Sequence, residues 1–174
     1  MGGIRASRTA RVASIALAVS LAGVAGLGCD DDAAPDEVDA AAAYTAIVEW
    51  QAGEQASSVD DGEEAELPVI YVVAADGETI DVGVQAAVTE STVDVATVRF
   101  ADEAGETFDA DLDGQPVRDH GSMLLVAAMP EPAPRVTVDL IRYLAAEESE
   151  PFRVEIRVED AGAGSAVVTS ATPM

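Results

Sequence analysis

Apolar and polar side chains alternate in several short stretches of this chain, and the first of these begins at residue 44. Its apolar positions are Tyr44, Ala46, Val48 and Trp50. A two-residue period is typical of a strand with one buried face, because successive side chains of a strand point to opposite sides. The alanines at positions 40–43 favour the alternative, a helix over residues 36–51, since alanine has the highest helix propensity. We interpret the alternation as a strand.

More strand signals follow a polar, acidic connection at residues 52–66. An apolar run at 67–74 is rich in β-branched residues, which is typical of a strand covered on both faces. The pair Asp76-Gly77 and the alternation at 80–85 then predict a hairpin, because Asp-Gly tolerates the positive φ angles of a tight turn. Further strands are predicted at residues 93–100, 107–108, 123–129, 135–143 and 152–158, with a final strand or a frayed end at 162–171.

About seven to nine short strands separated by turn residues are typical of an antiparallel β-sandwich. We therefore predict an all-β domain over residues 44–174 with an immunoglobulin-like architecture. The prediction concerns the architecture alone, because the sequence holds a single cysteine and lacks the cysteine pair of true immunoglobulin domains. If residues 135–143 and 152–158 pair as a hairpin, Arg153 or Arg157 comes to lie beside Asp139 or Glu155.

The N-terminal segment has a different pattern. Arg5, Arg8 and Arg11 precede an uncharged, largely apolar stretch at 12–28, which ends in Gly26-Leu27-Gly28-Cys29. A basic start followed by an apolar stretch and small residues is typical of an export signal. The arrangement resembles bacterial lipoprotein precursors, whose signal peptide ends at a cysteine that is lipidated and becomes the first residue of the mature chain. Gly28 fits the position that precedes this cysteine.

The resemblance implies a signal peptide over residues 1–28 and a lipid-bearing Cys29. The acidic, alanine-rich composition after this cysteine, interrupted by Pro35, predicts a flexible acidic linker, so that the lipidated residue and linker span residues 29–43. It also implies a location in the cell envelope, with the membrane contacted through the lipid. Anchoring of this kind gains about 0.8 kcal/mol for each buried methylene, and stable attachment needs more than one acyl chain. Three alternatives are cleavage by an ordinary signal peptidase, retention as an uncut anchor, and a buried core helix.

The charge balance narrows the possible partners. The chain has 33 acidic and 9 basic residues, for a formal net charge of −24, and removal of residues 1–28 would also remove three arginines. Nucleic-acid binding is not expected, because phosphate contacts need a basic surface. Docking of the protein surface on anionic lipid headgroups is not expected either. The sequence is nevertheless 49% hydrophobic, which is normal for a globular protein.

One acidic motif is a candidate metal site. Asp109, Asp111 and Asp113 alternate and are followed by Gly114, which resembles the first half of an EF-hand calcium loop. The second half differs, because Pro116 and His120 occupy positions where an aliphatic residue and a bidentate glutamate are expected. We consider a looser Ca²⁺ site, completed by Asp119 or Glu106, and the alternative of an acidic hairpin turn at residues 113–114. The turn is the favoured interpretation.

Candidate catalytic residues are few. His120 is the only histidine and lies two residues before Ser122, but no nucleophile-elbow motif surrounds this serine. Aromatic residues make up 4% of the chain, which leaves few stacking platforms for sugars. We therefore expect no enzyme. The sequence predicts a lipid-anchored envelope protein whose acidic domain is a binding or structural module for an envelope partner, with a calcium-binding surface module or an envelope hydrolase as alternatives.

Overall fold

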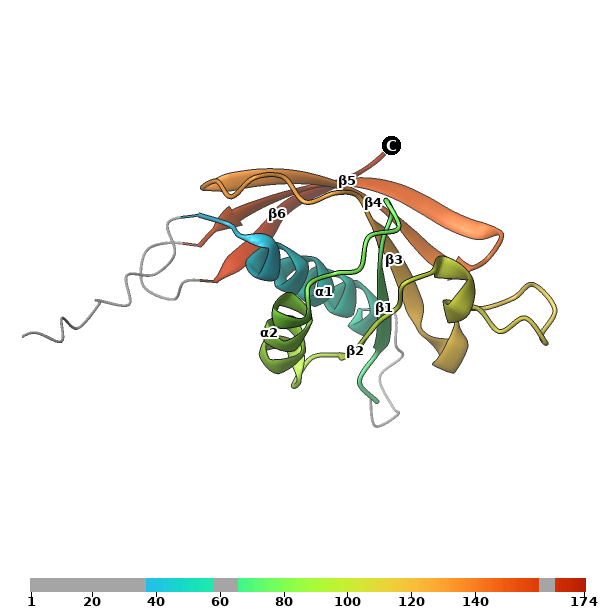
Figure 1. Ribbon diagram of the computed structural model, residues 1–174. Coiled ribbons are helices and arrows are strands. Elements are labelled where there is room, and N and C mark those ends of the chain that lie inside the picture. Colours follow the sequence, from blue (N-terminus) through green and yellow to red (C-terminus); the bar gives the residue numbers. More distant parts are fainter. Residues whose placement is uncertain (1–36, 58–65, 160–164) are drawn as a thin grey trace, which may run out of the picture. The chain divides into compact units, whose positions relative to one another are not determined.

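A computed structural model describes residues 37–57, 66–159 and 165–174, all of which belong to the second of the two units into which the chain divides, Asp32–Met174. The six strands of this part form a single mixed sheet in the order β2-β1-β3-β4-β5-β6 (Figure 1). They are β1 (Val69–Ala74), β2 (Thr97–Phe100), β3 (Ser122–Val126), β4 (Arg135–Ala145), β5 (Glu148–Val158) and β6 (Ala166–Pro173). The prediction of an all-β domain is confirmed only in part, because the described residues are largely β but include the two helices named below.

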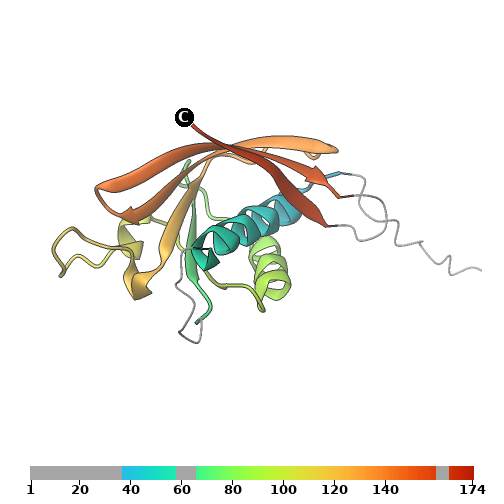
Figure 2. The ribbon, with the colours of Figure 1, turned by 180° about the vertical axis from the view of Figure 1, so that it is seen from behind.

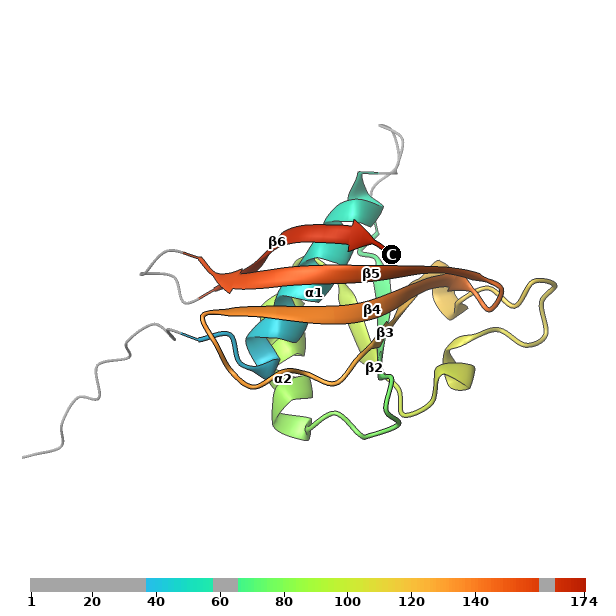
Figure 3. The same cartoon turned by 90° about the horizontal axis from the view of Figure 1, so that it is seen from above.

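The strands do not divide into the two facing sheets of the predicted sandwich. β1 pairs in parallel with β2 and β3, and β3 to β6 continue as an antiparallel meander. Helices α1 (Ala40–Ala56) and α2 (Val82–Thr92) pack on one face of the sheet, where the second sheet of a sandwich would lie (Figures 1 and 2). α1 runs obliquely beneath β4, β5 and β6 (Figure 3).

The strand predicted to begin at Tyr44 is wrong, because these residues belong to α1. The helix begins after Asp39, whose side chain accepts a hydrogen bond from the backbone N–H of Ala42 at 2.8 Å, a typical N-cap contact. Ala46, Ile47 and Val48 are all buried, so both phases of the apparent alternation are covered by the fold. α1 therefore begins within the expected linker at 29–43 and extends into the polar connection predicted at 52–66.

The hairpin predicted at residues 76–85 is also wrong. The turn itself forms, with Gly77 at a φ of 73° and its N–H bonded to the carbonyl of Ala74. The chain then enters α2, because the Asp81 side chain caps the helix by accepting hydrogen bonds from the N–H groups of Gly83 and Val84. This local capping takes precedence over the alternation of Ile80, Val82 and Val84.

The strands predicted nearest the C-terminus are confirmed. β4 and β5 pair along their length, with Asp139 opposite Arg153. These two side chains form a bidentate ion pair with N–O distances of 2.7 and 2.9 Å, as the hairpin prediction anticipated. β6 adds the final antiparallel strand. On the same face of the hairpin, Arg135 forms an ion pair with Glu155 at 3.4 Å.

Two apolar clusters cover β1 on both faces, as its apolar run predicted. The larger lies between the sheet and the helices and includes Ile70, Val72 and Leu124. The smaller lies on the opposite face and consists of Tyr71, Val73, Val117 and Met123. Residues 101–121 cover this second face, because the chain must cross β1 to pass from β2 to β3. This crossing segment positions the candidate site described below.

Candidate functional site

The crossing segment ends in a turn at residues 118–121 with an unusual backbone. Asp119 and His120 have φ angles of 56° and 52°, in the left-handed region that side-chain-bearing residues seldom adopt. Residues in such conformations cost of order 1–3 kcal/mol each and persist only where the surrounding structure holds them. The surrounding structure therefore holds the backbone of this turn in its unusual conformation.

Gly121 closes this turn against β1. Its N–H bonds to the carbonyl of Arg118 at 3.0 Å, and a Cβ at this position would lie 2.5 Å from the carbonyl oxygen of Val69. Such a contact is far inside van der Waals distance, so glycine is required here by close approach of two backbone segments. The packing of Gly121 on β1 fixes where Asp119 and His120 project.

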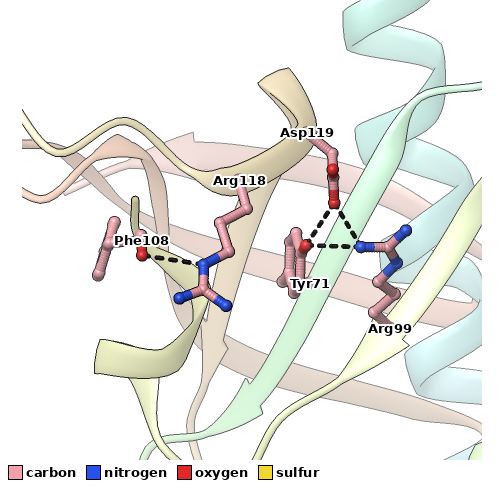
Figure 4. A network of polar contacts seen from close by, with 5 residues as sticks. All are labelled: Tyr71, Arg99, Phe108, Arg118 and Asp119. Carbon is pink, nitrogen blue, oxygen red and sulfur yellow. Dashed lines mark hydrogen bonds and ion pairs between the residues drawn. The ribbon is translucent and has the colours of Figure 1, made fainter. Parts of the chain in front are cut away.

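On one side of the turn, Asp119 joins a compact polar network with Tyr71 and Arg99 (Figure 4). The Tyr71 hydroxyl donates to an Asp119 carboxylate oxygen at 2.8 Å and accepts from the Arg99 guanidinium at 2.9 Å. Arg99 also forms an ion pair with Asp119. Tyr71 and Arg99 are register partners on β1 and β2, so the two strands hold both groups in place.

The pKa values of this network reflect its hydrogen bonds. Burial raises the pKa of Tyr71, and the hydrogen bond to Asp119 raises it further. The Tyr71 hydroxyl and the Arg99 guanidinium lower the pKa of Asp119. Arg118 is held separately, with its Nε donating to the Phe108 carbonyl at 3.1 Å (Figure 4). These contacts are local and mutually satisfied, which is the arrangement of a structural clamp on the turn.

On the other side of the turn, His120 and Gly121 line a groove of about 670 Å³ at the C-terminal end of α1. We call it the α1-end groove. Three aliphatic side chains line it while remaining 40–45% exposed, namely Leu67, Val95 and Leu144. Single exposed aliphatic residues are common on protein surfaces, whereas several that gather in one concave place indicate a binding site.

Three carboxylates line the same groove: Glu49, Glu66 and Asp94. None of them takes part in an ion pair within the described residues. Desolvation raises the pKa of Glu49, although this residue remains exposed. His120 is the one basic side chain on the lining. The groove thus combines the three aliphatic side chains, which we call its floor, with the three carboxylates, which we call its rim and which form no ion pair within the described residues.

The predicted calcium ligands lie elsewhere. Asp109, Asp111 and Asp113 occupy a small hairpin in which Phe108 bridges Val117, and the Asp109 side chain accepts a hydrogen bond from the N–H of Asp111 at 3.3 Å. In the described ranges, no group of three or more histidine, cysteine or acidic side chains is arranged to hold a metal ion. The favoured interpretation of this motif, an acidic hairpin turn, agrees with this geometry. Asp119 is engaged by Tyr71 and Arg99 instead.

The candidate catalytic pair is divided by the fold. Ser122 is fully buried on the helix side of the sheet, where its hydroxyl accepts a hydrogen bond from the Gln51 amide at 3.2 Å. His120 is exposed and lines the groove. Because α1 covers the serine, the structure does not bring His120 and Ser122 together as a catalytic pair.

Cys29 and the rest of the predicted signal segment lie outside the described residues. In the part of the chain that is described, no helix has both the length and the apolar character needed to cross a membrane. Comparison with protein-family models, with curated proteins and with solved structures finds no match for this chain. The function must therefore be inferred from the residues themselves.

Sequence reasoning did not identify the groove. Leu67 was interpreted as the first residue of a strand, and Val95 and Leu144 carry no motif. These residues come from segments more than 20 positions apart, and only the tertiary fold brings them together. One feature of the sequence does point to unpaired acids in this region. Residues 12–98 include no lysine or arginine, so this segment provides no cationic partner for its own acidic side chains.

Proposed function

We propose that this chain is a lipid-anchored protein of the cell envelope, and that its β-rich domain binds a protein partner through the α1-end groove. The anchoring part of the proposal rests on the arginines, the apolar stretch and the Gly28-Cys29 junction near the N-terminus. The domain is then held at a membrane through acyl chains, without any membrane contact by its strongly acidic surface.

The observation that carries the binding part is the exposure of Leu67, Val95 and Leu144 in one concave place. Covering them removes apolar surface from water, which is worth about 25 cal/mol for each Å² buried. A binding module agrees with the site better than an enzyme does, because the groove holds no buried nucleophile and no base paired with one among its described residues.

Membrane fractionation tests the anchoring part. We expect the full-length protein to be processed before Cys29, to incorporate a palmitate analogue and to sediment with membranes, whereas Cys29→Ser remains unlabelled and does not sediment after processing. An intact leader, or a processed wild-type chain in the soluble fraction with a free thiol, would contradict anchoring.

Site-specific photocrosslinking tests the binding part. A photoreactive amino acid in place of Val95 should give a discrete adduct in intact cells, and the same amino acid in place of Leu112 should not. Leu112 is a suitable control because it is similarly exposed, at 52%, but lies in the 109–114 turn outside the groove. The partner identified by mass spectrometry should then bind the purified protein, and Leu67→Ser should weaken that binding more than Leu112→Ser. Equal adducts at both positions would contradict the proposal.

A further inference from the structure

The floor and the rim of the α1-end groove have different chemistry, and together they specify a ligand. Leu67, Val95 and Leu144 offer aliphatic surface, which favours an aliphatic side chain of the ligand. The carboxylates reach the rim from three separate places: Glu49 from α1, Glu66 ahead of β1, and Asp94 after α2. Any ligand that fills the groove must therefore satisfy apolar and anionic surroundings at once.

Within the described residues, no ion pair compensates the negative charge of the rim. Elsewhere in the described residues, acids such as Asp119, Asp139 and Glu150 each have an arginine partner. Glu49, Glu66 and Asp94 have none, although carboxylates in a concave apolar site concentrate negative potential there. A ligand cation would supply the missing partner.

The placement of these carboxylates distinguishes an extended ligand from a metal ion. No three acidic or histidine side chains of the described residues are close enough to share one ion. The charges are therefore distributed around the groove, and a ligand that meets more than one of them needs cationic groups at separate positions. A peptide segment with basic and aliphatic side chains has this property, whereas a single cation does not.

The state of Glu49 supports the same ligand. Desolvation raises the pKa of this carboxyl, which means that the surroundings disfavour its charged form in the free protein. A cation placed next to Glu49 would favour the charged form and offset that cost. The unfavourable placement of the charge is understandable if it serves binding instead of stability.

From these observations, we propose that the α1-end groove binds a partner segment that carries both arginine or lysine and aliphatic side chains. The aliphatic side chains pack on Leu67, Val95 and Leu144, and the cations pair with Glu49, Glu66 and Asp94. This inference rests on the proposed function, and it adds the chemical class of the partner.

Titration with synthetic peptides tests the inference on the full-length protein in detergent. Three fluorescent peptides of equal length are compared: alternating Leu and Arg, alternating Leu and Glu, and alternating Ser and Arg. We expect the Leu–Arg peptide to bind best, because only this peptide matches both floor and rim.

Matched variants locate the binding. Glu49→Gln and Asp94→Asn should each weaken binding of the Leu–Arg peptide by about two- to fivefold, the range for a partly exposed ion pair. Asp113→Asn, which removes an equal charge from the remote hairpin, should leave the affinity unchanged. Added salt should weaken wild-type binding and reduce the difference between wild type and the groove variants.

Three results would overturn the inference. If the Ser–Arg peptide binds as tightly as the Leu–Arg peptide, or if Asp113→Asn weakens binding as much as Asp94→Asn, the attraction comes from the net charge of the chain. If the Leu–Glu peptide binds as well as the Leu–Arg peptide, the rim does not select for charge. Crosslinking at position 95 is a separate measurement. Adducts there would still support the proposed function even if the peptide titration contradicts the inferred basic and aliphatic character of the partner.

Discussion

The two sides of the 118–121 turn use similar side chains in opposite ways. On the Tyr71 side, an acid, a base and a hydroxyl bond to one another, and each charge has its partner. On the groove side, three carboxylates lie next to exposed aliphatic side chains and have no ion pair within the described residues. The mutual contacts on the Tyr71 side stabilise the fold. The unpaired carboxylates and exposed aliphatic side chains of the groove can instead form contacts with a ligand.

This difference teaches how to separate structural from functional charge in a very acidic protein. A count of acidic residues does not distinguish the two sides, because acids occur on both. What distinguishes them is compensation: Asp119 has a lowered pKa through its partners, whereas Glu49 has a raised pKa through desolvation. Variants on the two sides should therefore have effects of opposite sign on stability.

The largest effect is expected at the turn itself, from Gly121→Ala. The added Cβ would meet the Val69 carbonyl oxygen at 2.5 Å, so β1 or the turn must move. We expect a loss of about 2–4 kcal/mol in the free energy of unfolding, measured by urea denaturation. Gly53→Ala is the control, because a Cβ there meets nothing within 4 Å and helix propensity should add about 0.5–1 kcal/mol. Similar effects at both glycines would remove the steric argument.

The next largest effect is expected on the Tyr71 side of the turn. Tyr71→Phe keeps the ring but removes the hydroxyl that connects Asp119 with Arg99, and we expect a loss of about 1–2 kcal/mol in the free energy of unfolding. Tyr143→Phe should cost less, because the described residues offer its hydroxyl no hydrogen bond while its ring packs on Phe108 at a centroid distance of 5.9 Å. Equal losses would mean that the network does not hold the turn.

The parts of the fold that sequence predicts are those that depend on neighbouring residues. β4 and β5 pair across a short connection, so their alternation and the contact of Arg153 with Asp139 follow from local pattern. α1 was missed because Tyr44, Ala46, Val48 and Trp50 alternate within a segment that is buried in both phases. There the alanines and the Asp39 cap were the better evidence.

The candidate site depends on contacts between distant residues, which no local pattern encodes. The motif at Asp109, Asp111 and Asp113 was conspicuous in sequence because its members are neighbours, yet it forms only a turn in the described structure. The groove needs α1, the start of β1 and the end of β4 to meet, and α1 was itself predicted as a strand. The lipidation of Cys29 stays a prediction.

The pH dependence of stability should also distinguish the Tyr71 side of the turn from the groove side. Because its partners lower the pKa of folded Asp119, this carboxylate stabilises the fold above the ordinary aspartate pKa of about 3.9. That contribution is lost as the pH falls through the lowered pKa. Asp119→Asn should therefore be less stable than wild type at neutral pH, and the two should converge in strong acid. Parallel curves of unfolding free energy against pH would show that the charge of Asp119 is irrelevant.

A smaller effect of opposite sign is expected on the groove side. The raised pKa of folded Glu49 means that the wild type loses stability as the pH rises from the ordinary glutamate pKa, about 4.3, through the raised value. Glu49→Gln should then be more stable than wild type at neutral pH, by roughly a few tenths of a kcal/mol because the side chain is largely exposed. Thermal unfolding at two pH values measures this. Glu54→Gln, on the same helix outside the groove, is the control.

The smallest effect is expected from calcium, and it tests whether uncompensated charge alone makes a site. Asp109, Asp111 and Asp113 are as acidic as the groove, but the described hairpin does not gather them around one position. Calcium should therefore leave the melting temperature unchanged, and Asp111→Ala should respond to calcium and chelator as the wild type does. A calcium-dependent rise in melting temperature that Asp111→Ala abolishes would contradict this. It would also mean that the turn rearranges around an ion, and that an acidic cluster without apolar surroundings suffices for binding in this protein.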